Sequence, residues 1–192
     1  MFKRDLFSEE VASYLSEDEW LVIEDGYDAQ KNLAYESIFG LASGYMGNRA
    51  SHEEGDVRSS LPANYIHGVF DKSEAFQREL CNTPDWTKLK MYYKRDPIGI
   101  ESGQSLDEYI RVLDMKKGFL AKHYVTTAHD GRKTKVELIK FLSRGHNNLG
   151  LLRIYLTPIN YQGLFEFENI IDASVTNFMD FPRFRVKHLE TL

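Results

Sequence analysis

Apolar residues along this chain fall mostly in short runs separated by turn residues, which is the pattern of β-strands. In the second half the runs are regular and recur roughly every 8 to 15 residues. Such spacing, with few helical periods, predicts a mainly β chain folded as an antiparallel β-sandwich. The predicted strands are 20–24, 65–70, 89–93, 106–115, 119–128, 133–142, 149–157, 164–171 and 184–189.

Turn residues set the boundaries of several of these strands. Residues 129–132 read His-Asp-Gly-Arg between two β-rich runs, and Asp-Gly predicts a hairpin with a tight primed turn. Pro97 is expected to break off the strand at 89–93, and Pro158 to stop the strand at 149–157. Because the run 149–157 is apolar on both faces, we predict a central strand that is buried on both sides.

The N-terminal segment 1–19 is predicted to be an arm or a short helix. Ser8 is a suitable N-cap, and Val11 and Leu15 would share one face of the helix. The alternative is an arm that is ordered only by packing. Residues 20–192 contain no repeat and no linker, so they are expected to form one β-sandwich domain.

The composition argues against a nucleic-acid-binding protein, a disulfide-bonded protein and a membrane protein. The chain has 192 residues, of which 42% are hydrophobic, and a net charge of −5. An acidic balance argues against a nucleic-acid partner. The lone Cys81 cannot form an internal disulfide and is expected to be an ordinary, semi-buried thiol. No apolar run approaches the ~18 residues of a membrane span, and no signal peptide is evident, so we expect no membrane partner and a cytoplasmic location.

Residues 35–50, YESIFGLASGYMGNRA, are the most informative stretch. Gly40, Gly44 and Gly47 alternate with large side chains, which indicates positive φ or close backbone approach. The stretch lacks the features of a phosphate loop, a dinucleotide fingerprint or a nucleophile elbow. We interpret it as a backbone-shaping turn-and-strand motif, in which Glu36 and Arg49 satisfy each other or nearby main chain.

A metal site is not indicated. His52, Glu53 and Glu54 are adjacent in sequence, and adjacent side chains do not converge on one ion in extended or helical backbone. We therefore expect a solvated charged turn at these three residues.

Two carboxylates are candidates for glycoside chemistry, which uses a pair of Asp or Glu residues. Glu36 and Asp114 both lie in aromatic contexts of low charge. The alternative, which we favour, is that each accepts buried hydrogen bonds or pairs with an arginine such as Arg49 or Arg111.

The stretch 35–50 resembles the N-terminal motif E-S-I-F-x-L-G-N-G-Y-x-G-x-R-G of glycoside hydrolase family 65, the maltose, trehalose, kojibiose and nigerose phosphorylases. Further segments that resemble the family, in its order, are 20–27, 53–55, 65–71 (YIHGVFD), 82–86 (NTPDW), 111–118 (RVLDMKKG) and 143–158. The matching residues of the motif are Glu36, Ser37, Ile38, Phe39, Leu41, Gly44, Tyr45, Gly47 and Arg49, while Ala42, Ser43 and Ala50 depart from it.

The resemblance implies a fold and a reaction. The family's N-terminal part is a β-supersandwich, similar to galactose mutarotase, and a catalytic (α/α)6 barrel and a small β domain follow it. The reaction is inverting phosphorolysis of an α-glucosidic bond, with a glutamate of the barrel as acid and inorganic phosphate as co-substrate. Hydrolase members activate water with a second carboxylate instead, and no further cofactor is implied.

This chain is then expected to be an incomplete, non-catalytic N-terminal module that is inactive by itself. The absent catalytic barrel would be its main partner, and unpaired strand edges predict either a homodimer or a compact partial sandwich. No catalytic, cofactor-binding or metal residue is implied. The motif residues expected to be structural or to face the barrel are Glu36, Ser37, Phe39, Gly44, Tyr45, Gly47, Arg49, Arg111 and Asp114.

A stand-alone carbohydrate-binding or protein-interaction module remains the alternative. Tyr45, Tyr65, Trp86 and Tyr92 could stack on sugar rings, although in a strand-rich chain such residues are more often part of the core. If the chain is a scaffold domain, we expect weak or no binding of sugars.

Overall fold

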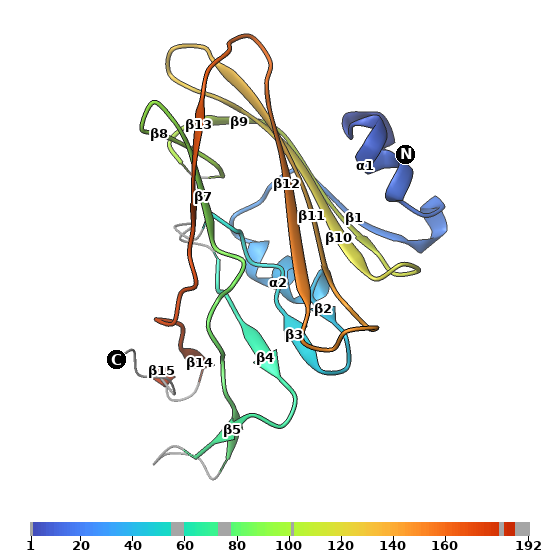
Figure 1. Cartoon of the computed structure of the whole chain (residues 1–192), viewed down its shortest axis with the longest axis vertical. Coiled ribbons are helices and arrows are strands. Elements are labelled where there is room, and N and C mark those ends of the chain that lie inside the picture. Colours follow the sequence, from blue (N-terminus) through green and yellow to red (C-terminus); the bar gives the residue numbers. More distant parts are fainter. Residues whose placement is uncertain (1, 55–59, 73–77, 101, 181–182, 187–192) are drawn as a thin grey trace.

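A computed structural model describes residues 2–54, 60–72, 78–100, 102–180 and 183–186. Its largest element is a five-stranded antiparallel sheet with the strand order β1-β9-β10-β11-β12 (Figure 1). The strands are β1 (Leu21–Asp25), β9 (Ser105–Asp114), β10 (Phe119–Thr127), β11 (Lys133–Leu142) and β12 (Gly150–Pro158). The predicted strands in these regions are therefore confirmed.

A second sheet packs on one face of the first, which we call the inner face. It has the order β13-β7-β8, with β7 (Leu89–Tyr93), β8 (Asp96–Ile98) and β13 (Phe165–Asn169). Met91 and Tyr93 of β7 pack against Tyr109, Tyr124 and Val136 of the large sheet. Two antiparallel sheets packed face to face make the predicted sandwich.

The remaining strands of the described residues form three small sheets. The first contains β2 (Leu41–Ala42), β3 (Met46–Asn48) and β4 (Asn64–Ile66); the others are the pairs β5 (Phe70–Asp71) with β6 (Glu79–Leu80), and β14 (Asn177–Asp180) with β15 (Arg183–Val186). Strand β15 covers the start of the strand predicted at 184–189, and the rest of that prediction lies outside the described residues.

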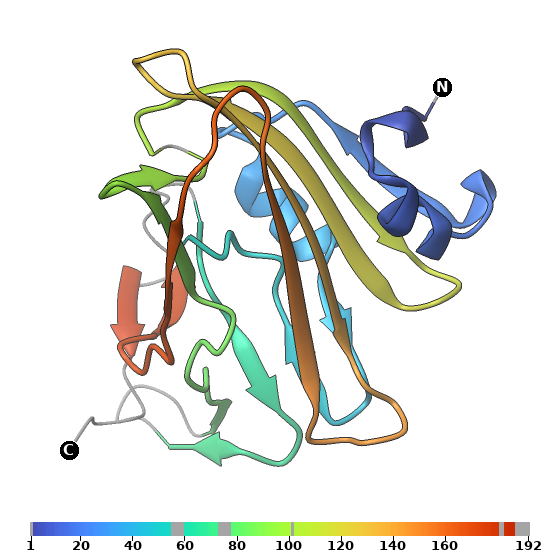
Figure 2. The ribbon, with the colours of Figure 1, turned by 45° about the horizontal axis from the view of Figure 1, so that its top comes forward.

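Two α-helices lie on opposite faces of the large sheet (Figures 1 and 2). Helix α1 (Glu9–Tyr14) begins at the predicted N-cap, where the Ser8 hydroxyl accepts the Val11 N–H at 3.4 Å, and it packs on the outer face. Short 3₁₀ turns, η1 (Arg4–Leu6) and η2 (Asp18–Trp20), flank it. None of the helices found is long and apolar enough to cross a membrane.

Helix α2 (Asn32–Ile38) lies on the inner face and was not predicted. It contains the first residues of the stretch 35–50, so the interpretation of that stretch as turn and strand alone is wrong. No side chain caps the N-terminus of α2, so one of the usual sequence signals for the start of a helix is missing. Fully buried Asn32 and Glu36 show that the helix is held by tertiary contacts.

Two predictions about strands are corrected, and one is refined. Strand β12 is an edge strand of the large sheet and not a central one, and Leu151 on its outer face is 38% exposed. The predicted end of the strand at 89–93 is confirmed, because β7 ends at Tyr93; Pro97 itself lies inside β8, which tolerates proline as an edge strand of the described sheet. The strand predicted at 65–70 is two strands, β4 and β5, which belong to different sheets.

The hairpin between β10 and β11 is confirmed, but its turn is not the primed type. The Gly131 N–H donates to Ala128 O at 2.9 Å, and φ is +83° at Gly131, while Asp130 is not among the residues with positive φ. The Ala128 N–H donates to Arg132 O at 2.9 Å and closes a loop of three residues, 129–131, in which left-handed glycine at the third position is typical. The primed turn instead joins β7 and β8, where Lys94 and Arg95 both have positive φ, of 50° and 70°.

Candidate functional site

Charged residues on the inner face of the large sheet form a cluster that is shut off from solvent. Strand pairing places Glu24 of β1 opposite Arg111 of β9, and Arg111 opposite Lys122 of β10. Lys140 of β11 points to the same face, because side chains alternate along a strand. Arg111 and Lys140 are 0% exposed and Lys122 is 1% exposed, which is rare for such residues unless they are paired.

Arg111 joins the sheet to α2 and to the segment that follows β3. Its Nε donates to Glu24 Oε2 at 2.7 Å, and its two terminal nitrogens donate to Ala50 O at 2.8 Å and to Asn32 Oδ1 at 3.1 Å. The guanidinium also lies 5.1 Å from the centroid of the Phe39 ring. Burial raises the pKa of Glu24, and Arg111 opposes that shift. Arg111 is therefore a structural clamp in which each of the three guanidinium nitrogens donates a hydrogen bond.

His52, Glu53 and Glu54 are buried, so the predicted solvated turn is wrong. Glu53 lies between the ammonium groups of Lys122, which donates to it, and Lys140, whose Nζ is 3.0 Å from Oε1. Burial by itself would raise the pKa of Glu53, but these two cations hold it well below its usual range.

His52 and Glu54, the neighbours of Glu53, make further buried contacts. Burial, and then the charge of Lys122, lower the pKa of His52 well below its usual value, so the imidazole stays neutral. Glu54 accepts a hydrogen bond from the Tyr124 hydroxyl. His52 and Glu53 both contact the Lys122 ammonium, whose Nζ lies 3.4 Å from His52 Nδ1. Within the described residues, no three His, Cys, Asp or Glu side chains are placed to hold a metal ion.

Glu36 is the centre of a second group of buried hydrogen bonds. It is 0% exposed, and its carboxylate contacts Arg49 Nε at 3.1 Å, the Leu61 N–H at 3.1 Å and Asn32 Nδ2 at 3.0 Å. Arg49 also donates to Ser37 Oγ at 2.6 Å. The predicted contact between Glu36 and Arg49 is therefore confirmed, and it ties α2 to the residues after β3.

The other motif residues shape this same region. Phe39 is fully buried and packs with Leu120 and Leu142 of the large sheet. Gly44 has a φ of +87° in the turn between β2 and β3, and Gly47 lies in β3 opposite Tyr65 of β4. The neighbour of Gly44, Tyr45, is 38% exposed and belongs to the surface.

Asp114 lies on the outer face and has no contact with the Glu36 group. Its carboxylate accepts the Ser16 N–H at 2.7 Å and the Lys117 N–H at 2.9 Å, which fastens the end of the N-terminal arm to the turn between β9 and β10. The hypothesis that Glu36 and Asp114 form a catalytic pair is wrong, because they lie on opposite faces of the sheet. The favoured alternative, buried hydrogen bonds to each, is confirmed.

The arrangement offers structural support and no exposed acid or nucleophile. Every carboxylate of the cluster is buried against a cation or hydrogen-bond donors. Cys81 is 4% exposed, and burial raises the pKa of its thiol, as expected of an inert cysteine. Trp86, one of the aromatic residues considered for sugar stacking, is partly buried and packs beside the Phe39 core and against Gly150.

Sequence reasoning missed Glu24, Asn32, Lys122 and Lys140 as members of the cluster. A signal existed for the two lysines. Lys122 ends the apolar run 119–122 (FLAK), and Lys140 interrupts the run 138–141 (LIKF). Each stands where an inward-facing side chain is expected to be apolar.

Comparison with known proteins gives a consistent result. The family model for the N-terminal domain of glycosyl hydrolase family 65 matches residues 22–192. The chain is 37% identical over 187 residues to a kojibiose phosphorylase of Thermoanaerobacter brockii, covering 97% of this chain and 24% of that protein. It is 28% identical over 183 residues to an α,α-trehalose phosphorylase of the same organism, covering 88% and 24%.

One solved structure has the same fold. It is a protein from the human microbiome that is provisionally assigned as a kojibiose phosphorylase, with a TM-score of 0.66 and 18% identity over 76% of this chain and 20% of that one. The chain thus spans about a quarter of the length of the curated relatives given above.

Proposed function

This chain belongs to glycosyl hydrolase family 65, as the N-terminal domain of that family, and we propose that it is the non-catalytic scaffold of an inverting disaccharide phosphorylase that acts on α-glucosides. The observation that carries the proposal is the closed charged cluster. Its acids are all committed to buried contacts, so the domain holds its own layers together and leaves the chemistry to another part of the enzyme. Inorganic phosphate would be the co-substrate of the whole enzyme.

The edges of the large sheet and of the second sheet support a further part of the proposal, which is that the domain packs against a partner. Strands β12 and β13 each have one unpaired edge among the strands described. Leu164, before β13, is 89% exposed, and Ile171, after it, is 76% exposed. Unprotected edges with apolar flanks are typical of surfaces that another strand or domain covers. The catalytic barrel and a second copy in a homodimer are the partners that we infer.

A domain-exchange experiment tests the scaffold. This chain replaces the matching N-terminal quarter of the Thermoanaerobacter brockii kojibiose phosphorylase, and formation of glucose 1-phosphate from kojibiose and inorganic phosphate is measured. We expect activity from the exchanged protein, and none from this chain alone or from the remainder of the phosphorylase alone. Glucose 1-phosphate formed by this chain alone, or a folded exchanged protein without activity, would contradict the proposal.

Calorimetric titration separates this function from that of a stand-alone sugar-binding module. Maltose, kojibiose and trehalose are titrated into this chain in turn. The scaffold predicts no resolvable heat of binding at millimolar sugar, since Trp86 packs against the Phe39 core and Gly150. Saturable binding at about millimolar concentration or below would favour the module.

A further inference from the structure

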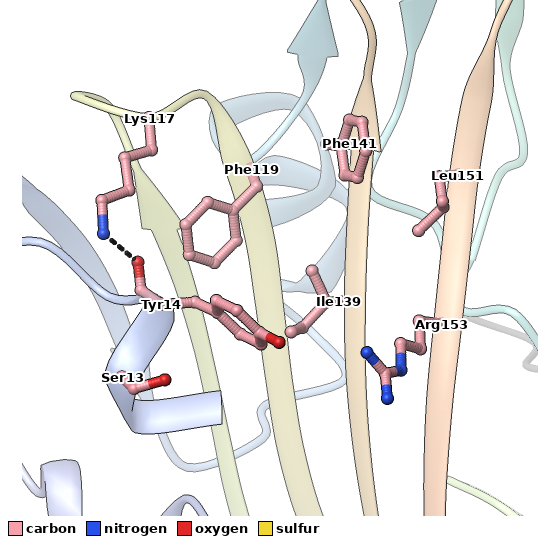
Figure 3. A pocket seen from close by; sticks show the side chains of 8 residues that line it. All are labelled: Ser13, Tyr14, Lys117, Phe119, Ile139, Phe141, Leu151 and Arg153. Carbon is pink, nitrogen blue, oxygen red and sulfur yellow. Dashed lines mark hydrogen bonds between the residues drawn. The ribbon is translucent and has the colours of Figure 1, made fainter. Parts of the chain in front are cut away.

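A groove of about 520 Å³ lies on the outer face of the large sheet, between α1 and β12 (Figure 3). Phe119, Ile139 and Phe141 form its floor on β10 and β11. Tyr14 of α1 and Leu151 of β12 form its two walls and are 40% and 38% exposed. A sheet face that meets water normally carries polar residues, so this apolar strip indicates a surface that is covered in the working protein.

The open part of the groove lies beside α1, next to β12. Helix α1 and its flanks pack over β1, β9 and β10, and the same apolar cluster includes Ile139 of β11, with Phe141 packed against it. Ile139 is 8% exposed, whereas Tyr14 and Leu151 are 40% and 38% exposed, so the room for another element lies between those two walls. A helix placed there would extend the layer that α1 begins.

The margins of the groove are positively charged. Its lining includes Lys117 and Arg153 and no carboxylate, although the whole chain has a net charge of −5. The Lys117 ammonium donates to Tyr14 O at 2.5 Å, and the Arg153 guanidinium is 3.1 Å from Glu10 Oε1. The pair with Glu10 is exposed, and both cations have further donors for an incoming carboxylate.

We propose that this groove receives an acidic amphipathic helix from the part of the enzyme that lies outside this domain. The inference rests on the proposed function, since it takes the helix from the remaining three quarters of a phosphorylase, of which this chain spans 24% in the relative given above. The helix lays leucine-sized side chains on Phe119 and Phe141 and places carboxylates beside Lys117 and Arg153. This is the helix-in-groove mode of recognition.

The test uses this chain and a synthetic probe. The probe is a fluorescein-labelled amphipathic helical peptide with leucine on one face and glutamate on its flanks, and the matched probe has lysine in place of each glutamate. Fluorescence anisotropy at low salt is expected to show saturable binding of the glutamate peptide, on the order of tenfold tighter than the lysine peptide. Leu151→Asp is expected to weaken binding by about tenfold or more, because it removes apolar contact and adds a like charge.

Two controls protect the conclusion. Leu164→Asp changes an apolar side chain that is 89% exposed and outside the groove, and it should leave binding unchanged. If Leu151→Asp does not fold, Arg153→Gln should reduce the preference for the glutamate peptide.

Equal binding of both peptides, or wild-type binding by the variants, overturns the proposal. So does a wild-type dimer that Leu151→Asp converts to a monomer in sedimentation, since a second copy would then occupy the groove. Loss of activity in the domain exchange with peptide binding intact would refute only the proposed function.

Discussion

Replacing Arg111 by methionine removes a buried cation whose partners all remain buried. Glu24 loses the donor at 2.7 Å, and Ala50 O and Asn32 Oδ1 lose donors at 2.8 and 3.1 Å. Breaking one side of a buried ion pair costs about 3–5 kcal/mol, because an uncompensated charge is left in the interior. We expect Arg111→Met to lower the free energy of unfolding by that amount, a large part of the total stability of a domain.

Urea unfolding followed by circular dichroism measures the effect. With a typical slope for a small protein, a loss of that size moves the midpoint down by roughly 2 M. The double variant Arg111→Met with Glu24→Leu is the matched control, since removing both charges leaves no unpaired ion. It should recover much of the loss. A single-variant penalty below about 1 kcal/mol would refute the clamp role of Arg111.

The pH dependence of the penalty is a second readout on the same variant. Burial raises the pKa of Glu24, and the loss of Arg111 raises it further. A carboxyl whose folded pKa is above its unfolded value contributes stability that is complete below the unfolded pKa and is lost as pH rises through the folded pKa. The penalty of Arg111→Met relative to wild type should therefore be largest at neutral pH and shrink on acidification towards about pH 4.5. A penalty that grows on acidification would contradict this reasoning.

Three further predictions concern the frame around the cluster. Gly150→Ala should cost about 1–3 kcal/mol of unfolding free energy, because a Cβ there would lie 2.6 Å from two ring carbons of Trp86. Hydrogen bonds from Lys88 and Ser174 lower the pKa of Asp172 to about 2, so Asp172→Asn should lose up to about 2 kcal/mol at pH 7, a difference that vanishes as pH falls through about 2. Asn-Gly in place of Lys94–Arg95 should raise the melting temperature by about 2–4 °C, because both residues have positive φ.

Each of these predictions has a matched control. Gly145→Ala places a Cβ with no atom within 4 Å and should change the free energy of unfolding by less than about 0.5 kcal/mol. Equal effects of the two alanine variants would contradict the close approach of Trp86. Lys88→Met should show a weaker pH dependence of the same sign as Asp172→Asn, since it breaks the 2.8 Å pair but leaves the hydrogen bonds from Ser174. Lys94→Val should lower the melting temperature, because a β-branched residue is strained at positive φ.

The strands of the large sheet could be predicted because their evidence is local. Alternation along residues 105–158 and the Asp-Gly signal at 130–131 depend on neighbours in sequence, and the structure places β9, β10, β11 and β12 there. The turn types could not be assigned in the same way. Gly131 serves a longer loop, while the primed turn uses Lys94 and Arg95, residues whose intrinsic preference is against positive φ. Pairing of β7 with β8 imposes that conformation.

The cluster shows the limit of local reasoning. His52, Glu53 and Glu54 look like a charged turn, and nothing near them in sequence predicts burial. Glu53 is buried because Lys122, which is 69 residues away, points to the same face of the sheet and pairs with it. Whether a charge is paired or solvated depends on which segment covers it, and such long-range contacts leave no periodic trace.

By itself the sequence determined the β-sandwich class, the hairpin between β10 and β11 and, through residues 35–50, the resemblance to family 65. The reason is that strand alternation, glycine positions and motif spacing are properties of the chain read in order. Only the tertiary structure decided that β12 is an edge, that α2 exists and that the charged residues are buried. Those features follow from which faces meet, and the packing of one layer on another sets the environment of every side chain between them.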